Sequence, residues 1–175
     1  MAVRDEQVLS VATEVLVADP AASLGSVAAA AGMGRTTLHQ RFPTREALVQ
    51  AVAQDALARL DAAVDAALHG DGDLLQQLLD ALIPLGPQIA FLLRHPAVSE
   101  AELQERVAAQ NVRIEARIVA AQEAGVLSRS VPAWWIRSTV DALAYAAWEA
   151  VAEGRLARLD AADLARRTLG SGVES

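Results

Sequence analysis

The chain has 175 residues, of which 53% are hydrophobic, 21% charged and only 3% aromatic, a balance that argues against wholesale disorder and predicts an aliphatic, alanine-rich core. Its formal net charge of −7 excludes a general polycation, so contact with a nucleic acid would need a local basic patch. The chain has no cysteine, which excludes disulfides and thiolate metal sites.

The first two predicted helices lie before a glycine turn. Apolar residues recur at helical spacing from the start of the chain and predict a first helix over about residues 5–18. The segment ADPAAS breaks this helix, and Ser23 is a suitable N-cap for a short second helix that reaches Ala31. Gly32 follows at the point where a helix commonly ends on a left-handed residue.

A third helix, predicted over Arg35–Arg41, gives the segment the pattern of a helix-turn-helix. Ala28 supplies the small side chain that lets two helices cross closely, Gly32 allows the turn, and Leu38 is the large apolar anchor. The opposite face carries polar side chains that can reach phosphates and base edges in a major groove: Arg35, Thr36, His39 and Gln40. From spacing alone, an ordinary helical hairpin with a solvated polar face is the alternative.

A long fourth helix is predicted after Pro43, with Thr44 as its cap and one apolar stripe that continues to Leu68. Residues 23–49, SLGSVAAAAGMGRTTLHQRFPTREALV, resemble the N-terminal signature of the tetracycline-repressor (TetR) family of bacterial transcriptional regulators. That signature has an Ala-Gly turn, a recognition helix ending in Leu-Tyr-x-His-Phe, and a fourth helix that starts Pro-Ser-Lys-Glu-x-Leu. The corresponding segments here read LHQRF and PTREAL.

Three positions depart from the family pattern. His39 stands where the family usually has tyrosine, and Arg45 replaces the usual lysine. Gly34 stands at the cap of the recognition helix, where serine or threonine is commoner, so the cap lacks a side-chain bond to a backbone N–H. The resemblance implies that the cation of Arg45 faces a DNA phosphate.

The polar face and the resemblance together predict a set of DNA-contacting residues: Ser26, Arg35, Thr36, Thr37, His39, Gln40, Arg41, Thr44 and Arg45. Residues 1–50 contain four arginines and five acidic residues, a formal net charge of −1. The DNA-binding surface must therefore concentrate its cations. Because Arg35, Arg41 and Arg45 lie close together in the sequence, we expect a narrow basic face and weak non-specific affinity for DNA.

The resemblance divides the chain into a DNA-binding domain over residues 1–45 and a helical ligand-binding and dimerisation domain over residues 46–175. Pro84, Gly86 and Pro87 interrupt an otherwise apolar helical run in the second domain. The interruption fits two helices joined by a turn. It equally fits a kinked helix beside a ligand cavity, which the resemblance implies.

Two of the remaining predicted helices have recognisable ends. One covers about residues 99–124, with Ser99 as its cap and Gly125 at its close. The last helix of the chain has Asp160 as its cap and is expected to end before Gly170. The predicted fold is therefore all-α, with an N-terminal three-helix DNA-binding domain followed by a C-terminal helical domain.

The helix predicted over residues 132–153 has apolar residues on two faces. One face can pack within its own domain, and the other is expected to pack against a second copy of the chain. A positive mean hydropathy of +0.25 fits this reading, since such a surface would otherwise be an exposed apolar patch. The predicted homodimer interface consists mainly of this helix and the helix over residues 160–169.

A mostly apolar cavity is predicted between the helices at 71–95, 99–124 and 132–153, for a small hydrophobic effector and not for a sugar or nucleotide. The predicted ligand-binding residues are Gln88, Phe91, Asn111, Trp135, Tyr145 and Trp148. His69 and His95 have no second ligand at metal spacing, and no catalytic set of side chains stands out. The sequence therefore predicts no metal, no cofactor and no enzymatic activity.

These features predict a homodimeric transcriptional regulator. By the resemblance it is a repressor that leaves a palindromic double-stranded DNA operator when its effector binds. The alternative is a helical binding or scaffold protein of the same fold that has lost specific operator recognition. The start of the chain lacks the apolar core of a signal peptide and no segment is long and apolar enough to span a membrane, so the expected location is the cytoplasm.

Overall fold

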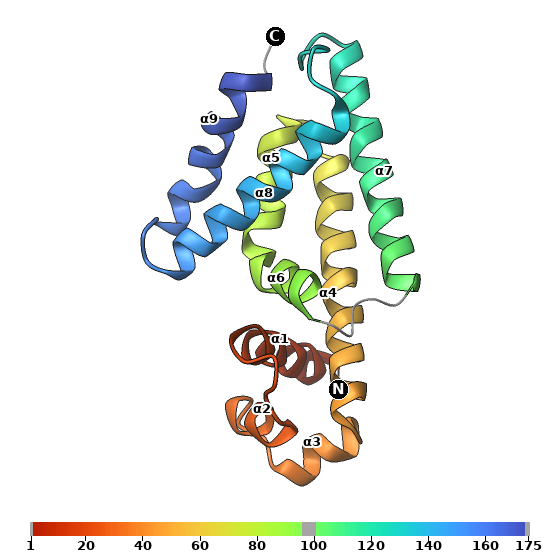
Figure 1. Cartoon of the computed structure of the whole chain (residues 1–175), viewed down its shortest axis with the longest axis vertical. Coiled ribbons are helices and arrows are strands. Elements are labelled where there is room, and N and C mark those ends of the chain that lie inside the picture. The colour runs from red at the N-terminus through yellow and green to blue at the C-terminus, as the bar shows by residue number, and fades with distance from the viewer. Residues whose placement is uncertain (1, 96–100, 174–175) are drawn as a thin grey trace. The chain divides into compact units, whose positions relative to one another are not determined.

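The computed structural model describes residues 2–95 and 101–173, and most of these are helical, which confirms the all-α fold class (Figure 1). The α-helices are α1 (Ala2–Ala18), α2 (Leu24–Ala30), α3 (Arg35–Arg41), α4 (Arg45–Leu68), α5 (Leu74–Leu82), α6 (Gly86–Arg94), α7 (Ala101–Glu123), α8 (Ala133–Ala152) and α9 (Ala161–Val173). Two short 3₁₀ turns also form, η1 (Ile83–Leu85) and η3 (Arg158–Asp160).

The chain divides into two compact units. The first consists of Met1–Arg59 and Pro87–Gln104, and the second of Leu60–Gly86 and Glu105–Ser175. This division differs from the boundary expected after residue 45, because the first part of α4 and most of α6 belong to the same unit as α1, α2 and α3. The functional division after residue 45 stays a prediction.

The core of the first unit joins α6 to the helices of the helix-turn-helix. Ala28 and Leu38, the two residues expected to pack where α2 and α3 meet, are both buried. Phe91 of α6 belongs to the same apolar cluster, with 1% of its surface exposed. The aliphatic members of this cluster include Leu16, Val27, Leu48, Val49 and Val52. The helices of the helix-turn-helix therefore share one core with a helix from much later in the sequence.

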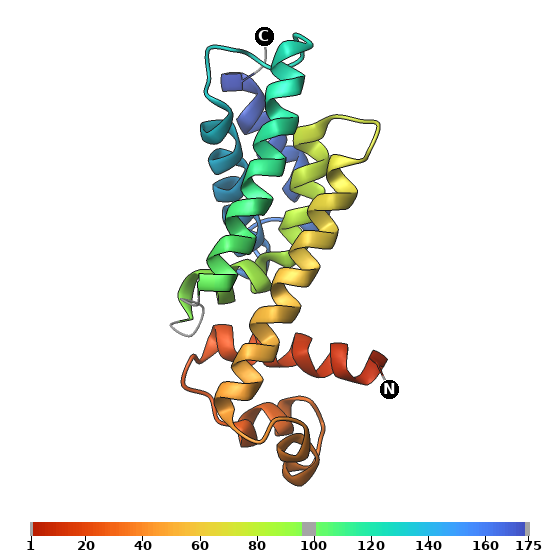
Figure 2. The same ribbon diagram turned by 90° about the vertical axis from the view of Figure 1, so that its right-hand side faces the viewer.

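The second unit is built around α5, α8 and α9, which pack on one another (Figure 1). Their buried side chains are aliphatic, and they include Leu75, Leu78, Leu79, Ile136, Val140, Ala165 and Leu169. The second half of α4 lies beside α7 (Figure 2), where Asp61 accepts a hydrogen bond of 2.7 Å from Arg106 and Asp65 pairs with Arg113. Partly exposed ion pairs of this kind contribute little to the free energy of unfolding. We therefore infer that they align α4 and α7.

Several helix boundaries differ from the expected ones. The helix α1 starts at Ala2, earlier than expected, and the expected cap at Ser99 lies outside the described residues. The prediction that Gly170 ends the last helix is wrong, because α9 continues through it to Val173. Glycine is unfavourable inside a helix by about 1 kcal/mol. The burial of the neighbouring Leu169 in the second unit offsets this cost.

The interruption near Pro84 is a short η1 turn between α5 and α6, which matches the interpretation of two helices joined by a turn. Pro84 lies in the turn itself, and Pro87 lies in the first turn of α6, where its missing N–H costs no helical hydrogen bond. That this break between α5 and α6 lines a ligand cavity stays a prediction. Among the described residues, no helix is both long enough and apolar enough to cross a membrane.

Candidate nucleic-acid interface

The N-cap of α2 helps to position α3, because α2 packs on α3. Ser23 has extended backbone dihedrals, and its Oγ accepts a hydrogen bond of 3.1 Å from the backbone N–H of Ser26. The hydroxyls of the two serines also lie 3.0 Å apart. This arrangement confirms the expected N-cap of the second helix. It also means that Ser26, predicted to contact DNA, has its backbone N–H occupied by the cap while its side chain lies beside the Ser23 hydroxyl.

The turn between α2 and α3 has the geometry that the glycine pattern predicts. Gly32 has a φ of 63°, in the left-handed region that favours glycine. The backbone N–H of Met33 then donates to the carbonyl of Ala28 at 2.8 Å, which closes the turn. Leu38 has no exposed surface and anchors α3 to the core of the first unit. The helix begins after Gly34, which makes no side-chain cap bond because glycine has no side chain.

The exposed surface of α3 is polar. It carries Arg35, Thr36, Thr37, His39 and Gln40. Thr44, at the end of the segment that follows, is also exposed, and its Oγ1 accepts a hydrogen bond of 3.1 Å from the N–H of Ala47 at the start of α4. The structure thus brings these side chains onto one short helix and its flank, where they can donate to and accept from the edges of bases.

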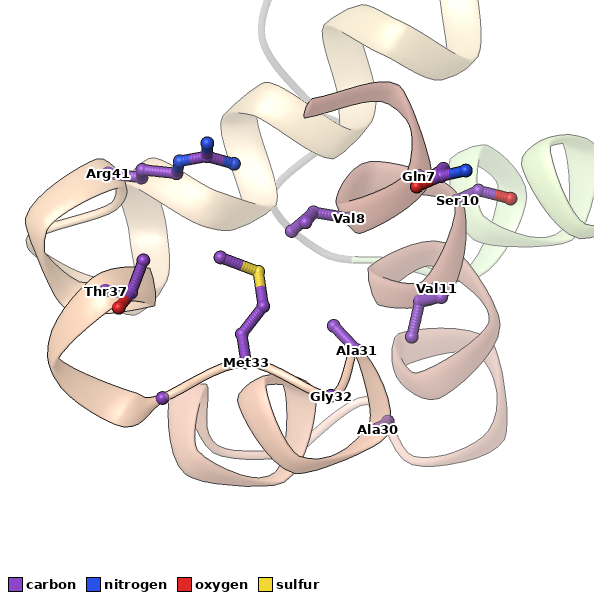
Figure 3. Close-up of a pocket in the computed structure, with 11 residues that line it drawn as sticks. Gln7, Val8, Ser10, Val11, Ala30, Ala31, Gly32, Met33, Thr37 and Arg41 are labelled. Carbon is purple, nitrogen blue, oxygen red and sulfur yellow. The ribbon is translucent and has the colours of Figure 1, made fainter. Parts of the chain in front are cut away.

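Arg41 lies one turn after Thr37, and both line a cleft beside α1. Its side chain is half-buried and points into a cleft of about 680 Å³ between α1 and α3 (Figure 3). Val8 of α1 and Met33 of the turn point into the same space, and Gln7 and Ser10 form part of its other side (Figure 3).

Arg45 is half-buried and folds back onto an earlier part of the chain. Its Nε donates to the carbonyl oxygen of Ala22 at 3.1 Å, and its Nη2 donates to the carbonyl oxygen of Pro20. Both carbonyls belong to the connection between α1 and α2. The side chain of Arg45 is thereby held against this connection. Sequence reasoning placed Arg45 on the phosphate-facing surface and missed these two contacts.

Of the three arginines expected to form a narrow basic face, Arg35 is exposed whereas Arg41 and Arg45 are half-buried, and their contact with DNA stays a prediction. Arg35 is exposed and lies beside Gly25 of α2, where a Cβ would be 3.2 Å from its Nε. Gly25 thus leaves space for the guanidinium against α2, a role that sequence reasoning missed. A glycine inside a seven-residue helix was the available signal, since glycine is unfavourable there.

Two of the predicted ligand-binding residues lie in the first unit. Phe91 stacks on His95 with a ring-centroid distance of 4.9 Å and belongs to the apolar core. Gln88 is buried, and its Oε1 has no hydrogen-bond partner among the described residues. Burial lowers the pKa of His95, and the nearby charge of Arg45 lowers that pKa further. Both effects favour the neutral form of His95 beside the cation of Arg45.

The other four predicted ligand-binding residues lie in the second unit. Trp135 is 55% exposed at the start of α8 and makes an edge contact with Trp134, whereas Asn111 is half-buried on α7. Tyr145 and Trp148 form a tilted ring pair with centroids 5.5 Å apart. A cleft of about 450 Å³ in this unit is lined instead by residues that include Asp73, Leu75, Leu127 and Arg166. The six residues are thus divided between the units, and their ligand role stays a prediction.

Comparison with known proteins gives consistent results. The family model for bacterial regulatory proteins of the tetR family matches residues 8–52. The HTH-type transcriptional repressor LfrR of Mycolicibacterium smegmatis is 31% identical over 170 residues, which cover 95% of this chain and 88% of that protein. The crystal structure of the TetR-like regulator LfrR from Mycobacterium smegmatis in complex with proflavine has a TM-score of 0.73 and 30% identity, with 98% of each chain covered. A TetR-like regulator from Rhodococcus sp. RHA1 has a TM-score of 0.66 and 22% identity, with 98% of this chain and 96% of that one covered.

Proposed function

Because the chain belongs to the TetR family of bacterial transcriptional regulators, we propose that it is a homodimeric repressor released from a palindromic operator by a small hydrophobic effector. Regulators of this family are not enzymes. The chain would act in the cytoplasm, where the operator DNA is found.

The exposed polar face of α3 carries the proposal. Leu38 fixes this helix from its buried side, and the Gly32 turn sets its direction from α2. In a helix-turn-helix the second helix lies in the major groove, with its first residues nearest the base edges. Thr36, near the start of α3, is exposed and would read bases, whereas Arg35, Ser26 and Thr44 would contact the phosphate backbone. His39 and Gln40 continue the same surface.

Homodimerisation would supply a second recognition helix, which binds the second half-site of the operator. A two-fold dimer places two recognition helices about one DNA turn, roughly 34–36 Å, apart, and the operator is then palindromic. On α8 the residues Ile136, Val140, Ala144 and Ala147 are buried within the second unit, while Ala142 and Ala146 are exposed. Leu164 on α9 is exposed as well. These apolar side chains support an interface formed mainly by α8 and α9.

The effector would be a small, largely hydrophobic and at least partly aromatic molecule. The relative LfrR has been crystallised with proflavine, a planar aromatic amine. In this chain Tyr145 and Trp148 are half-buried aromatic side chains on α8, and both were predicted to contact a ligand. Stacking on such rings favours flat aromatic ligands. The effector would act by a population shift, since it can change the affinity for DNA only as far as it binds one conformation better than the other.

A mobility-shift experiment with double-stranded DNA that flanks the gene of this chain tests the function. The expected result is a shifted band at nanomolar protein, competed by the same unlabelled DNA but not by a mixed-sequence duplex. Added proflavine is the probe for release, and because this planar cation also intercalates into DNA, its effect on an unrelated repressor–operator pair is the control. A chain that binds proflavine but shifts both duplexes equally would support the alternative, a ligand-binding protein of the same fold without operator recognition.

A further inference from the structure

The cation that begins α4 is half-buried and is held by two backbone carbonyls of the first unit. Arg45 donates from Nε to the carbonyl oxygen of Ala22 at 3.1 Å and from Nη2 to that of Pro20, which lie 23 and 25 residues earlier in the sequence. A guanidinium is planar and presents its N–H groups in a fixed fork, so it can bridge two nearby carbonyls. The ammonium of a lysine has no such fork.

The two carbonyls belong to a connection whose position determines where α2 starts. Ala22 is buried in the first unit, and its N–H donates to the carbonyl of Asp19 at 3.0 Å. The carboxylate of Asp19 accepts a further hydrogen bond of 2.9 Å from the N–H of Ala21. Ser23, the next residue, caps α2. Because α2 packs on both α1 and α3, a displaced connection would displace the recognition helix.

Two neighbouring features describe the surroundings of Arg45. At the start of α4 the Oγ1 of Thr44 accepts a hydrogen bond from the N–H of Ala47, so the side chain of Thr44 caps the first turn of this helix. His95, buried at the end of α6, lies near enough for the charge of Arg45 to lower its pKa, in addition to the larger effect of burial. The guanidinium therefore lies between the connection after α1 and the end of α6, within the first unit.

We propose that Arg45 is a positioning residue, which fixes the connection between α1 and α2 and thereby the seat of the recognition helix, and that it does not contact a DNA phosphate. This proposal rests on the proposed operator binding. It reassigns a residue that its place in the sequence marks as a phosphate ligand. Arg35, which is exposed, takes the electrostatic role instead.

Salt dependence separates the two roles. Removal of one phosphate-binding cation lowers the slope of log affinity against log salt by about one, whereas removal of a positioning side chain leaves the slope unchanged. We would select a duplex from a random-sequence library with the wild-type chain, then titrate Arg45→Ala, Arg45→Lys and Arg35→Ala at several salt concentrations. Thermal unfolding checks that each variant is folded.

The expected result is that Arg45→Ala weakens binding about fivefold or more with an unchanged slope, because it removes two hydrogen bonds from a charged donor. Arg45→Lys, which keeps the charge but lacks the fork, weakens binding as well. Arg35→Ala lowers the slope by about one. The proposal is overturned if Arg45→Ala lowers the slope by about one while Arg45→Lys restores both affinity and slope, or if Arg45→Ala leaves the affinity unchanged.

Hydrogen exchange gives a readout that does not need DNA. In Arg45→Ala and Arg45→Lys the backbone amides of Ala22, Ser26 and Val27 should exchange faster than in the wild type, because the connection that caps α2 is loosened. Unchanged exchange at these amides would contradict the positioning role. A wild-type chain that selects no duplex from the library would contradict operator binding instead, and the exchange experiment would still decide the role of Arg45.

Discussion

The indole of Trp148 lies directly against the backbone of Gly86, so that a Cβ at residue 86 would be only 1.9 Å from Trp148 Cγ. The ring can occupy this position only because residue 86 has no side chain. Gly86 begins α6, directly after η1, and Trp148 comes from α8. A residue at the break between α5 and α6 thus determines where one ring of the Tyr145–Trp148 pair lies.

Gly86→Ala should therefore destabilise the chain by about 1–3 kcal/mol, because the added methyl group forces the indole to move from a packed position. Urea unfolding measures this cost, and a changed tryptophan emission reports the displaced ring. The matched test is the same substitution in a Trp148→Ala background. There the cost should vanish, since the clashing group is absent. An equal cost in both backgrounds would show that the glycine is needed for its backbone alone.

Replacement of Gly34 by serine should stabilise α3. Gly34 has the extended dihedrals of an N-cap, and a Cβ there would meet only Thr37 Oγ1, at an ordinary distance of 3.6 Å. Serine adds an acceptor for an N–H of the first turn, worth a few tenths of a kcal/mol over glycine. We expect Gly34→Ser to raise the melting temperature by about 1 °C. Gly34→Ala adds the Cβ without the acceptor and is the control; an equal rise with alanine would assign the gain to backbone entropy.

The proposed dimer can be tested on α9. Leu164 is 44% exposed there, so a glutamate at this position leaves the fold of one chain intact but buries a charge in an interface formed by α8 and α9. Leu164→Glu should weaken dimerisation about tenfold or more in sedimentation equilibrium. Val112→Glu, at an exposed apolar position on α7, is the matched control and should leave the dimer unchanged. Dissociation by Val112→Glu alone would place the interface on α7.

Local signals in the sequence predict much of the first unit. Gly32 and Pro43 bracket α3, and both act through the backbone of their own neighbours, so the bounds of this helix follow from the sequence. The exposed face of α3 follows as well, because Leu38 fixes which side is buried.

Contacts between distant residues account for what the sequence could not predict. Arg45 folds back because two carbonyls far earlier in the chain lie within its reach, and no periodicity indicates such an interaction. The one available signal was arginine in place of the family's lysine, since the planar fork can bridge two acceptors. Gly170 was expected to end α9, but the burial of Leu169 overrides the local preference. The packing of Trp148 on Gly86 likewise depends on tertiary structure.

The central claim is that the exposed face of α3 reads DNA sequence, and Thr36 tests it most directly. Thr36 lies near the start of α3 and is exposed. The measurement is a fluorescence-anisotropy titration of wild type and Thr36→Ala with the selected duplex and with a mixed-sequence duplex at the same salt concentration. Thr36→Ala is expected to bind the selected duplex about 1–3 kcal/mol more weakly and to bind the mixed-sequence duplex like the wild type. Equal weakening on both duplexes, or none on the selected one, would contradict the placement of this face of α3 in the major groove.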